Sequence, residues 1–300
     1  MGSIKKSKGF NERKRRPTTK DWAEAIQSLR PYHRLDILLK IKRMARSTFF
    51  YHIKPKADKY GRIRELIAQI YHGHDQRYGS RRVCLQLRLQ GEIINHKVVA
   101  RLMHEMGLFA KRPKRRYNSF HGIVGKVAPN ILNRDFATTG PNQKWATDVT
   151  QMVVKGHRCY LSAVLDMWNG EIISYTVSDS PNLPLVLAMM KKALKQRTCL
   201  RGLIIHSDQG WHYQHEKYQH ILNQNGILQS MSRKGNCLDN AMMENFFGLM
   251  KNELLYAGDF ADVPSFIIAL KKYITYYNND RIKLRLKMSP VQYRLAHLEP

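Results

Sequence analysis

The chain has 300 residues, of which 43% are hydrophobic and 10% aromatic, so it can bury a core and form two or three domains. A run of about 18 apolar residues, needed for a membrane-spanning helix, does not occur. The basic N-terminus lacks the apolar stretch of a secretory signal. Four cysteines without a Cys-x-x-Cys pair argue against a disulfide framework or zinc ribbon and favour a reducing cytoplasm.

The charge indicates a polyanionic partner. There are 51 Lys and Arg residues against 23 Asp and Glu, a net charge of +28, whereas a magnitude of about 2–8 gives a small domain adequate solubility. Residues 1–140 hold 32 basic and 10 acidic residues, and residues 141–300 hold 19 and 13. We therefore expect the front half, residues 1–140, to bind double-stranded DNA, and the back half, residues 141–300, to carry a more ordinary charge.

The front half is predicted to be helical. Residues 1–20 are expected to form a basic, flexible arm, and residues 21–110 a helix-turn-helix DNA-binding region. Ser47 and Thr48 are expected to cap one helix and Asn95 another. The basic residues expected to contact DNA here are Arg81, Arg82, Lys97 and Arg101. The alternative is a plain helical hairpin whose charges face only solvent.

A basic linker is predicted over residues 111–140. Its KRPKRR run can neutralise phosphates without reading sequence, and Pro113 prevents a helix there. The alternative is a solvated linker without DNA contact. The residues concerned are Lys111, Arg112, Lys114, Arg115 and Arg116.

Residues 141–256 are predicted to form an α/β domain, followed by a helical extension over 257–300. Strands are expected at 145–154, 157–166, 171–177, 202–207 and 227–231, and helices at 184–196, 216–223, 239–255 and 263–278. Short turns join antiparallel strands, whereas helical crossovers join parallel strands. The predicted fold is a mixed five-stranded sheet of RNase H-like topology, flanked by helices.

Acidic residues are scarce here, and three stand out. Asp148 lies within the first strand, Asp208 follows a short buried strand, and Glu244 lies on a helix away from its apolar stripe. Asn240 and Lys251 share the helix face of Glu244, so we expect them to contact DNA. Each acid taken singly is also consistent with a helix cap or a surface charge, and spacing alone does not select these three.

The chain resembles the catalytic (OrfB-type) DDE transposases of insertion sequences, whose core is similar to retroviral integrase. The matching stretches are KWATDVT, HSDQG and SRKGNCLDNAMMENFFGLMKNEL, which hold Asp148, Asp208 and Glu244, with 35 residues between the last two. YGSRRVCLQL, NHKVVARLMHEMGL and the ending YITYYNNDRIKLRLKMSPVQYR also match. The resemblance implies that the three acids hold two Mg²⁺ or Mn²⁺ ions.

The implied reaction is hydrolysis at an element end, followed by attack of the freed 3′-OH on another phosphodiester. Arg233 and Lys234, in a loop before the Glu244 helix, are expected to hold phosphate or to form an exposed turn. The resemblance implies a homodimer or larger assembly on DNA, an upstream-frame fusion or partner protein, and work at the nucleoid. The alternatives are an inactive DNA-binding repressor and a nuclease that stops at hydrolysis.

Overall fold

A computed structural model of the protein describes residues 17–54, 58–111, 127–133, 135–197, 200–233 and 240–298. The chain divides into two compact units, residues 1–61 and residues 62–300. The boundary at residue 61 falls inside the predicted 21–110 region, so the two helical groups of that region belong to different units.

The first unit is a small helical cluster. Its helices are α1 (Thr19–Leu29), α2 (Leu35–Lys42) and α3 (Arg46–Ile53). They enclose Ala23, Ile26, Leu38, Leu39 and Phe49. The predicted cap at Ser47 or Thr48 is wrong. The helix begins at Arg46, because the turn after α2 is made by Arg43 in the left-handed region, at φ 55°.

The second unit begins with three helices, here called the helical module (residues 62–107). They are α4 (Gly61–Gly73), α5 (Ser80–Leu89) and α6 (His96–Glu105). Each buries an apolar stripe, as with Val99, Leu102 and Met103 on α6. The predicted Asn95 cap is confirmed, because its Oδ1 accepts a hydrogen bond from the Lys97 N–H at 2.8 Å.

The mixed sheet has the order β3-β2-β1-β4-β5. The strands are β1 (Lys144–Val154), β2 (His157–Asp166), β3 (Ile172–Ser178), β4 (Ile204–Ser207) and β5 (Leu228–Met231). β2 pairs antiparallel with β1 and β3, and β4 pairs parallel with β1 and β5. The predicted topology is confirmed, since the short turns give antiparallel pairs and the crossovers give parallel ones.

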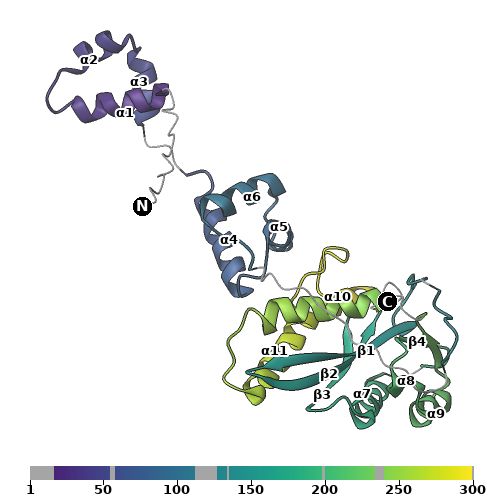
Figure 1. The fold of residues 1–300 in the computed structure, drawn as a ribbon. Coiled ribbons are helices and arrows are strands. Elements are labelled where there is room, and N and C mark those ends of the chain that lie inside the picture. Colours follow the sequence, from purple (N-terminus) through teal and green to yellow (C-terminus); the bar gives the residue numbers. More distant parts are fainter. Residues whose placement is uncertain are drawn as a thin grey trace, which may run out of the picture. The chain divides into compact units, whose positions relative to one another are not determined.

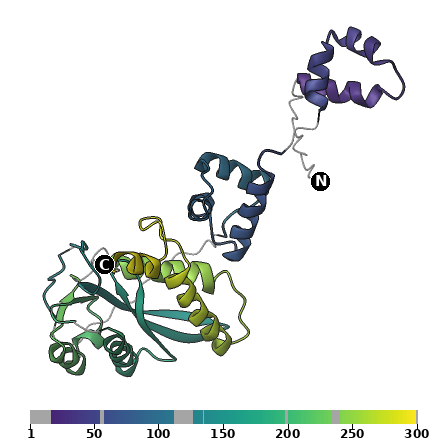
Figure 2. The same cartoon turned by 180° about the vertical axis from the view of Figure 1, so that it is seen from behind.

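Helices cover both faces of the sheet (Figure 1, and from behind in Figure 2). On one face, α10 (Ala241–Met250) and α11 (Val263–Asn279) bury Phe246, Phe266 and Tyr277 against β1 and β2. The other face carries α7 (Leu183–Gln196), the single turn α8 (Trp211–Gln214) and α9 (Glu216–Gln224). The sheet is therefore buried on both sides, which fixes the ends of its strands.

The helix predicted over 239–255 differs in its second half. α10 ends at Met250 and continues directly into η2 (Lys251–Leu255), a π-helical turn closed by the Tyr256 N–H on the Lys251 carbonyl at 2.8 Å. Such turns are rare and occur often at functional sites. A further helix, α12 (Pro290–Leu298), ends the described chain.

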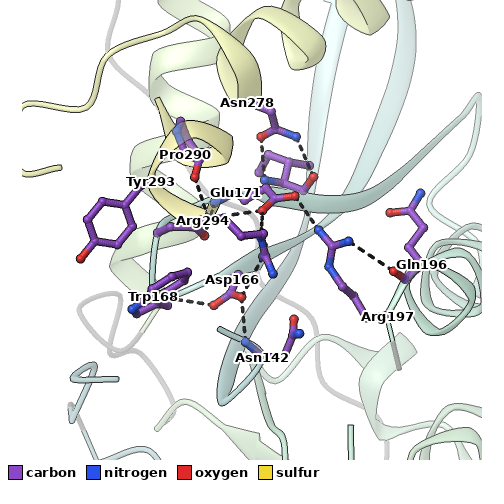
Figure 3. Close-up of polar contacts among 12 residues, drawn as sticks. Asn142, Asp166, Trp168, Glu171, Gln196, Arg197, Asn278, Pro290, Tyr293 and Arg294 are labelled. Carbon is purple, nitrogen blue, oxygen red and sulfur yellow. Dashed lines mark hydrogen bonds and ion pairs between the residues drawn. The ribbon is translucent and has the colours of Figure 1, made fainter. Parts of the chain in front are cut away.

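A buried ion network ties this C-terminal segment to the turn between β2 and β3 (Figure 3). Arg294 of α12 donates to Glu171 at 2.5 Å and to Asp166 at 3.3 Å. Arg197, at the end of α7, donates to the other oxygen of Glu171 at 2.6 Å. The extension predicted over 257–300 is thus held to the sheet by charged groups as well as by α11.

Polar contacts also occupy backbone groups at both edges of the sheet. On β3, the Asn278 side chain accepts from the Ile172 N–H and donates to the Ile172 carbonyl, both at 2.9 Å. On β5, the Met231 N–H donates to the Pro129 carbonyl at 3.4 Å, and the Ser230 side chain accepts from the Ile131 and Leu132 N–H groups at 3.0 and 3.1 Å. Among the described residues, no helix has the length and apolar character to cross a lipid bilayer.

Candidate active site

Asp148 lies in the middle of β1, the central strand. The strand forms here because apolar and small residues alternate on both covered faces, so an acid at this position is held rigidly. Its Oδ1 accepts a hydrogen bond from the Val149 N–H at 2.7 Å. The carboxylate is therefore oriented by the backbone of its own strand.

Asp208 follows the last residue of β4, the strand parallel to β1. Its Oδ1 accepts from the Gly210 N–H at 2.8 Å. A Cβ at position 210 would lie 2.9 Å from that oxygen, closer than such atoms normally approach. A side chain at position 210 would force this carboxylate oxygen to shift, which gives the glycine of the HSDQG stretch a physical reason.

Glu244 lies in the first turn of α10, which packs on the sheet face that includes β1. Its side chain is on the exposed side of the helix, and partial burial raises the pKa of its carboxyl. Asn240, at the start of the helix, donates to the Thr147 carbonyl at 3.5 Å. That contact anchors the first turn of α10 beside Asp148.

The electrostatics place the three acids near one another. Burial raises the pKa of Asp148 well above its ordinary value, and the charges of Asp208 and, to a smaller extent, Glu244 raise it further. The Val149 N–H and Lys251 act in the opposite direction. Within the described ranges, which include all three acids, no three Asp, Glu, His or Cys side chains gather closely enough to hold a metal ion.

The sequence reasoning missed Tyr213, which lies beside the two aspartates. Its hydroxyl is 3.5 Å from Thr147 Oγ1. Burial raises the pKa of Tyr213 well above its ordinary value, and the charges of Asp148 and Asp208 raise it further. The phenol therefore stays neutral there. No periodicity marks this residue, because it lies on the one-turn helix α8.

Comparison with known proteins identifies the family. An integrase core domain model matches residues 138–237, a second one residues 244–298, and an HTH-like domain model residues 59–116. The putative transposase of insertion element IS150 from Escherichia coli is 47% identical over 90% of this chain and 97% of its own length. The IS904 transposase of Lactococcus lactis is 35% identical over 77% and 93%.

The chain belongs to the insertion-sequence transposases. The transposase has an RNase H-like integrase core, it is a polynucleotidyl transferase, and it acts on DNA in transposition. The predicted family, fold class and function are thus confirmed. Among solved structures, the HTLV-2 integrase catalytic core in complex with magnesium is a more distant likeness. It is 20% identical, has a TM-score of 0.43, and covers 53% of this chain and 99% of that chain.

The transposase exposes most of the described basic residues that were predicted to contact DNA. Arg81, Lys97 and Lys111 are exposed. Arg101 is exposed and pairs with Glu105 one helical turn away, at 3.6 Å. Arg233 is exposed and donates to Asn133 at 2.6 Å. The other predicted residues, Arg112, Lys114, Arg115, Arg116 and Lys234, lie outside the described residues.

Three predicted DNA contacts need correction. Asn240 and Lys251 are each 5% exposed, whereas Glu244 between them is exposed, because Asn240 donates to the Thr147 carbonyl of β1 and the Lys251 ammonium lies close enough to Asp148 for their charges to interact. Burial lowers the pKa of Lys251 to about 8, and the negative charge of Asp148 opposes that effect. Arg82 is half-buried and donates to the Ile282 carbonyl at 3.0 Å, so its guanidinium faces the core of the protein.

Proposed function

We propose that this transposase cleaves DNA at the ends of its element and joins the freed 3′ end to another phosphodiester, with Asp148, Asp208 and Glu244 holding two Mg²⁺ or Mn²⁺ ions. The observation that carries the proposal is the mutual placement of these acids. They come from a central strand, a neighbouring parallel strand end and the helix above, and their charges raise the pKa of Asp148.

The residues fit a hard divalent cation. The donors are carboxylate oxygens only, which Mg²⁺ and Mn²⁺ prefer over nitrogen or sulfur ligands. Burial is the main cause of the raised pKa of Asp148, and without a cation the negative charges of Asp208 and Glu244 oppose its ionisation further. Two bound ions would neutralise this charge, activate the attacking hydroxyl and stabilise the leaving oxygen.

The protein's own part is to hold these groups in place. The Val149 N–H fixes one oxygen of Asp148, and the Gly210 N–H fixes one oxygen of Asp208. Asn240 holds the first turn of α10, so Glu244 stands over the same strand. Among the described residues the three acids do not gather closely enough to hold an ion, and we propose that they draw together once a divalent cation neutralises their repulsion.

We infer that the helical module binds the element ends. Lys97 and Arg101 lie on the exposed face of α6, and Arg81 is exposed on α5. A helix of this kind, entering the major groove with basic residues at its surface, is how helix-turn-helix proteins read DNA. Pairing two ends needs at least two copies, so we propose a dimer or larger assembly on DNA at the nucleoid. An upstream-frame partner would supply further end recognition.

The test is a strand-transfer assay with duplex DNA that carries the repeats flanking the coding sequence. Wild type with Mg²⁺ or Mn²⁺ should give nicked and joined strands on a denaturing gel. Asp208→Ala and Glu244→Gln should each lower both products more than about 100-fold, because a lost metal ligand removes several kcal/mol of transition-state stabilisation. DNA affinity should stay within about threefold, since neither side chain is among the basic groups that contact phosphate.

Asp259→Asn is the matched control, because Asp259 is an exposed acid paired with Lys155 away from these residues. It should leave both products unchanged. Nicked strands without joined strands would instead favour a nuclease. DNA binding without either product, with and without an upstream-frame fusion, would favour an inactive regulator. Full activity of Glu244→Gln would overturn its assignment.

A further inference from the structure

The helical module contacts the C-terminal segment of the core, around residues 280–282, through a buried tyrosine. Tyr78, just before α5, is fully buried. Its hydroxyl donates to the Asp280 carbonyl at 3.2 Å and accepts from the Ile282 N–H at 2.8 Å. Arg82 adds its bond to the Ile282 carbonyl. The module therefore holds the backbone on both sides of Arg281.

A second set of contacts joins the module to α11 and the π-turn. Arg77 donates to the Glu253 carbonyl at 3.3 Å, and its guanidinium lies over the rings of Tyr273 and Tyr276 at 5.5 and 5.0 Å. His74 stacks on Tyr78 with the ring centroids 3.9 Å apart, and its Nδ1 lies 3.3 Å from the Tyr276 hydroxyl. The module thus touches the backbone of η2 directly.

Both sets of contacts converge on the Glu253 side chain. Arg281 donates to the two Glu253 oxygens at 2.6 and 2.8 Å, a bidentate pair in which the arginine side chain is 2% exposed and the glutamate 11%. Tyr273 donates to the same carboxylate at 3.0 Å. A buried, bidentate pair of this kind specifies one arrangement of the elements that carry it.

Glu253 is also close in sequence to the proposed chemistry. It lies in the π-turn two residues after Lys251, whose charge acts on Asp148, and nine residues after Glu244 on the continuous α10. The π-turn adds one residue to the helical repeat after Lys251, so the angular position of Glu253 relative to Lys251 and Glu244 depends on this turn, and fixing Glu253 fixes the rotation of α10. Within that turn, Glu253 is held by its bidentate ion pair with Arg281.

We propose that Glu253 is a positioning residue. Its ion pair with Arg281 fixes the π-turn, and thereby the positions of Lys251 and Glu244 relative to Asp148. Those positions would then depend on how the helical module packs on the C-terminal segment. DNA bound by the module would then restrict the motion of α10, the helix that carries Glu244. The catalytic consequence rests on the function proposed above, whereas the mechanical link from module to π-turn does not.

The mechanical link is tested by amide hydrogen exchange on the full chain, with and without duplex DNA carrying the flanking repeats. DNA should slow exchange in the module and also over residues 251–256, where the Tyr256 N–H closes the π-turn. Tyr78→Phe removes the hydroxyl that meets Asp280 and Ile282, so the slowing should persist in the module and vanish over 251–256. Tyr71→Phe is the matched control, because the Tyr71 hydroxyl donates to the Phe109 carbonyl at 2.7 Å and not to the C-terminal segment.

The positioning role is tested by separating DNA affinity from the rate of bound DNA cleavage. Glu253→Gln should lower the single-turnover rate at least about 10-fold while the Kd for DNA stays within about threefold, because small misplacements of reacting groups are costly. Glu171→Gln removes a comparably buried partner of arginines Arg197 and Arg294, away from the π-turn. It should lower thermal stability and leave the single-turnover rate within about threefold.

Each result decides between the proposals. Equal loss of rate in Glu253→Gln and Glu171→Gln, or a loss of affinity that matches the loss of rate, would overturn the positioning role. Unaltered exchange slowing over 251–256 in Tyr78→Phe would overturn the link even if Glu253→Gln did not fold. A wild type that shows the exchange response but makes no cleaved strand would overturn the proposed function alone.

Discussion

The burial of Asp148 makes the stability of the folded chain depend on pH. Its pKa is higher in the folded chain than in the unfolded chain, through burial and the charge of Asp208, so the folded form holds this proton more tightly. Its contribution to stability is therefore present at low pH and lost as pH rises through the folded pKa. We expect Asp148→Asn to raise the stability of the metal-free protein at neutral pH by about 1 kcal/mol, or roughly 2–4 °C in Tm.

Thermal unfolding at two pH values checks this expectation. The gain should shrink at pH 4, where the wild-type carboxyl is closer to its protonated form, and Mg²⁺ should raise the Tm of wild type more than that of Asp148→Asn. A variant that is less stable than wild type at neutral pH would contradict it. Asp259→Asn, at an exposed and paired acid, should shift the Tm little at either pH.

The resemblance to the insertion-sequence transposases singled out the three acids through its three matching stretches and the 35-residue spacing, and helical geometry placed Asn240 and Lys251 on the face of Glu244. That geometry gives the angle of a side chain around the helix axis but not what packs against that face. The covering strand β1 turned two expected DNA contacts into buried groups. Tyr213 was missed for the same reason, since its position beside the aspartates arises only when α8 folds over the strand ends.

At the scale of elements, α12 depends on its ion network more than on its own helical preference. It has nine residues, and Arg294 bridges Glu171 and Asp166 with an 11% exposed side chain. Short helices gain most of their stability from tertiary contacts. Arg294→Met should lower the free energy of unfolding by about 3 kcal/mol, because it leaves buried carboxylates with too few partners.

Urea unfolding measures this loss. Lys155→Met is the control, because it breaks an ion pair whose side chains are both more than half exposed, and it should cost less than about 1 kcal/mol. Similar losses in the two variants would mean that the network contributes no more than a surface pair. Retention of the α12 amide protection in Arg294→Met would likewise argue against the role of this arginine.

Most strands and long helices were predictable because their periodicity is local. The predicted strand over 157–166 coincides with β2, and the predicted helix over 263–278 differs from α11 by one residue. The π-turn was not predictable, since the inserted residue is stabilised by Arg281 and Tyr273 from a distant segment. The bounds of α12 within the predicted helical extension were not predictable either, because its anchoring partners lie more than a hundred residues earlier in the chain.

At the scale of the whole molecule, the basic excess should appear as a salt-dependent affinity for DNA. Each phosphate neutralised changes the slope of log affinity against log salt by about 0.9. Replacing Lys111, Arg112, Lys114, Arg115 and Arg116 with Gln should therefore make the slope shallower by up to about 4.5. Fluorescence anisotropy of labelled duplex DNA over a salt series measures it.

The control replaces Lys191, Lys192 and Lys195 with Gln. These exposed lysines lie on α7, on the sheet face opposite α10. Their replacement lowers the net charge without changing the linker, so the slope of log affinity against log salt should change less per charge removed. An equal change per charge would mean that the general field of the protein, rather than the KRPKRR run, sets the affinity.

The Asn278 side chain forms with Ile172 the two backbone hydrogen bonds that a sixth strand would form at that position. An open sheet edge invites another chain to add a strand, which is the first step of cross-β growth. Here an amide from α11 occupies the ladder position on β3, and the Met231 N–H of β5 donates to the Pro129 carbonyl. Both edge strands thus have backbone groups already bonded within the chain, which disfavours strand addition by a second copy.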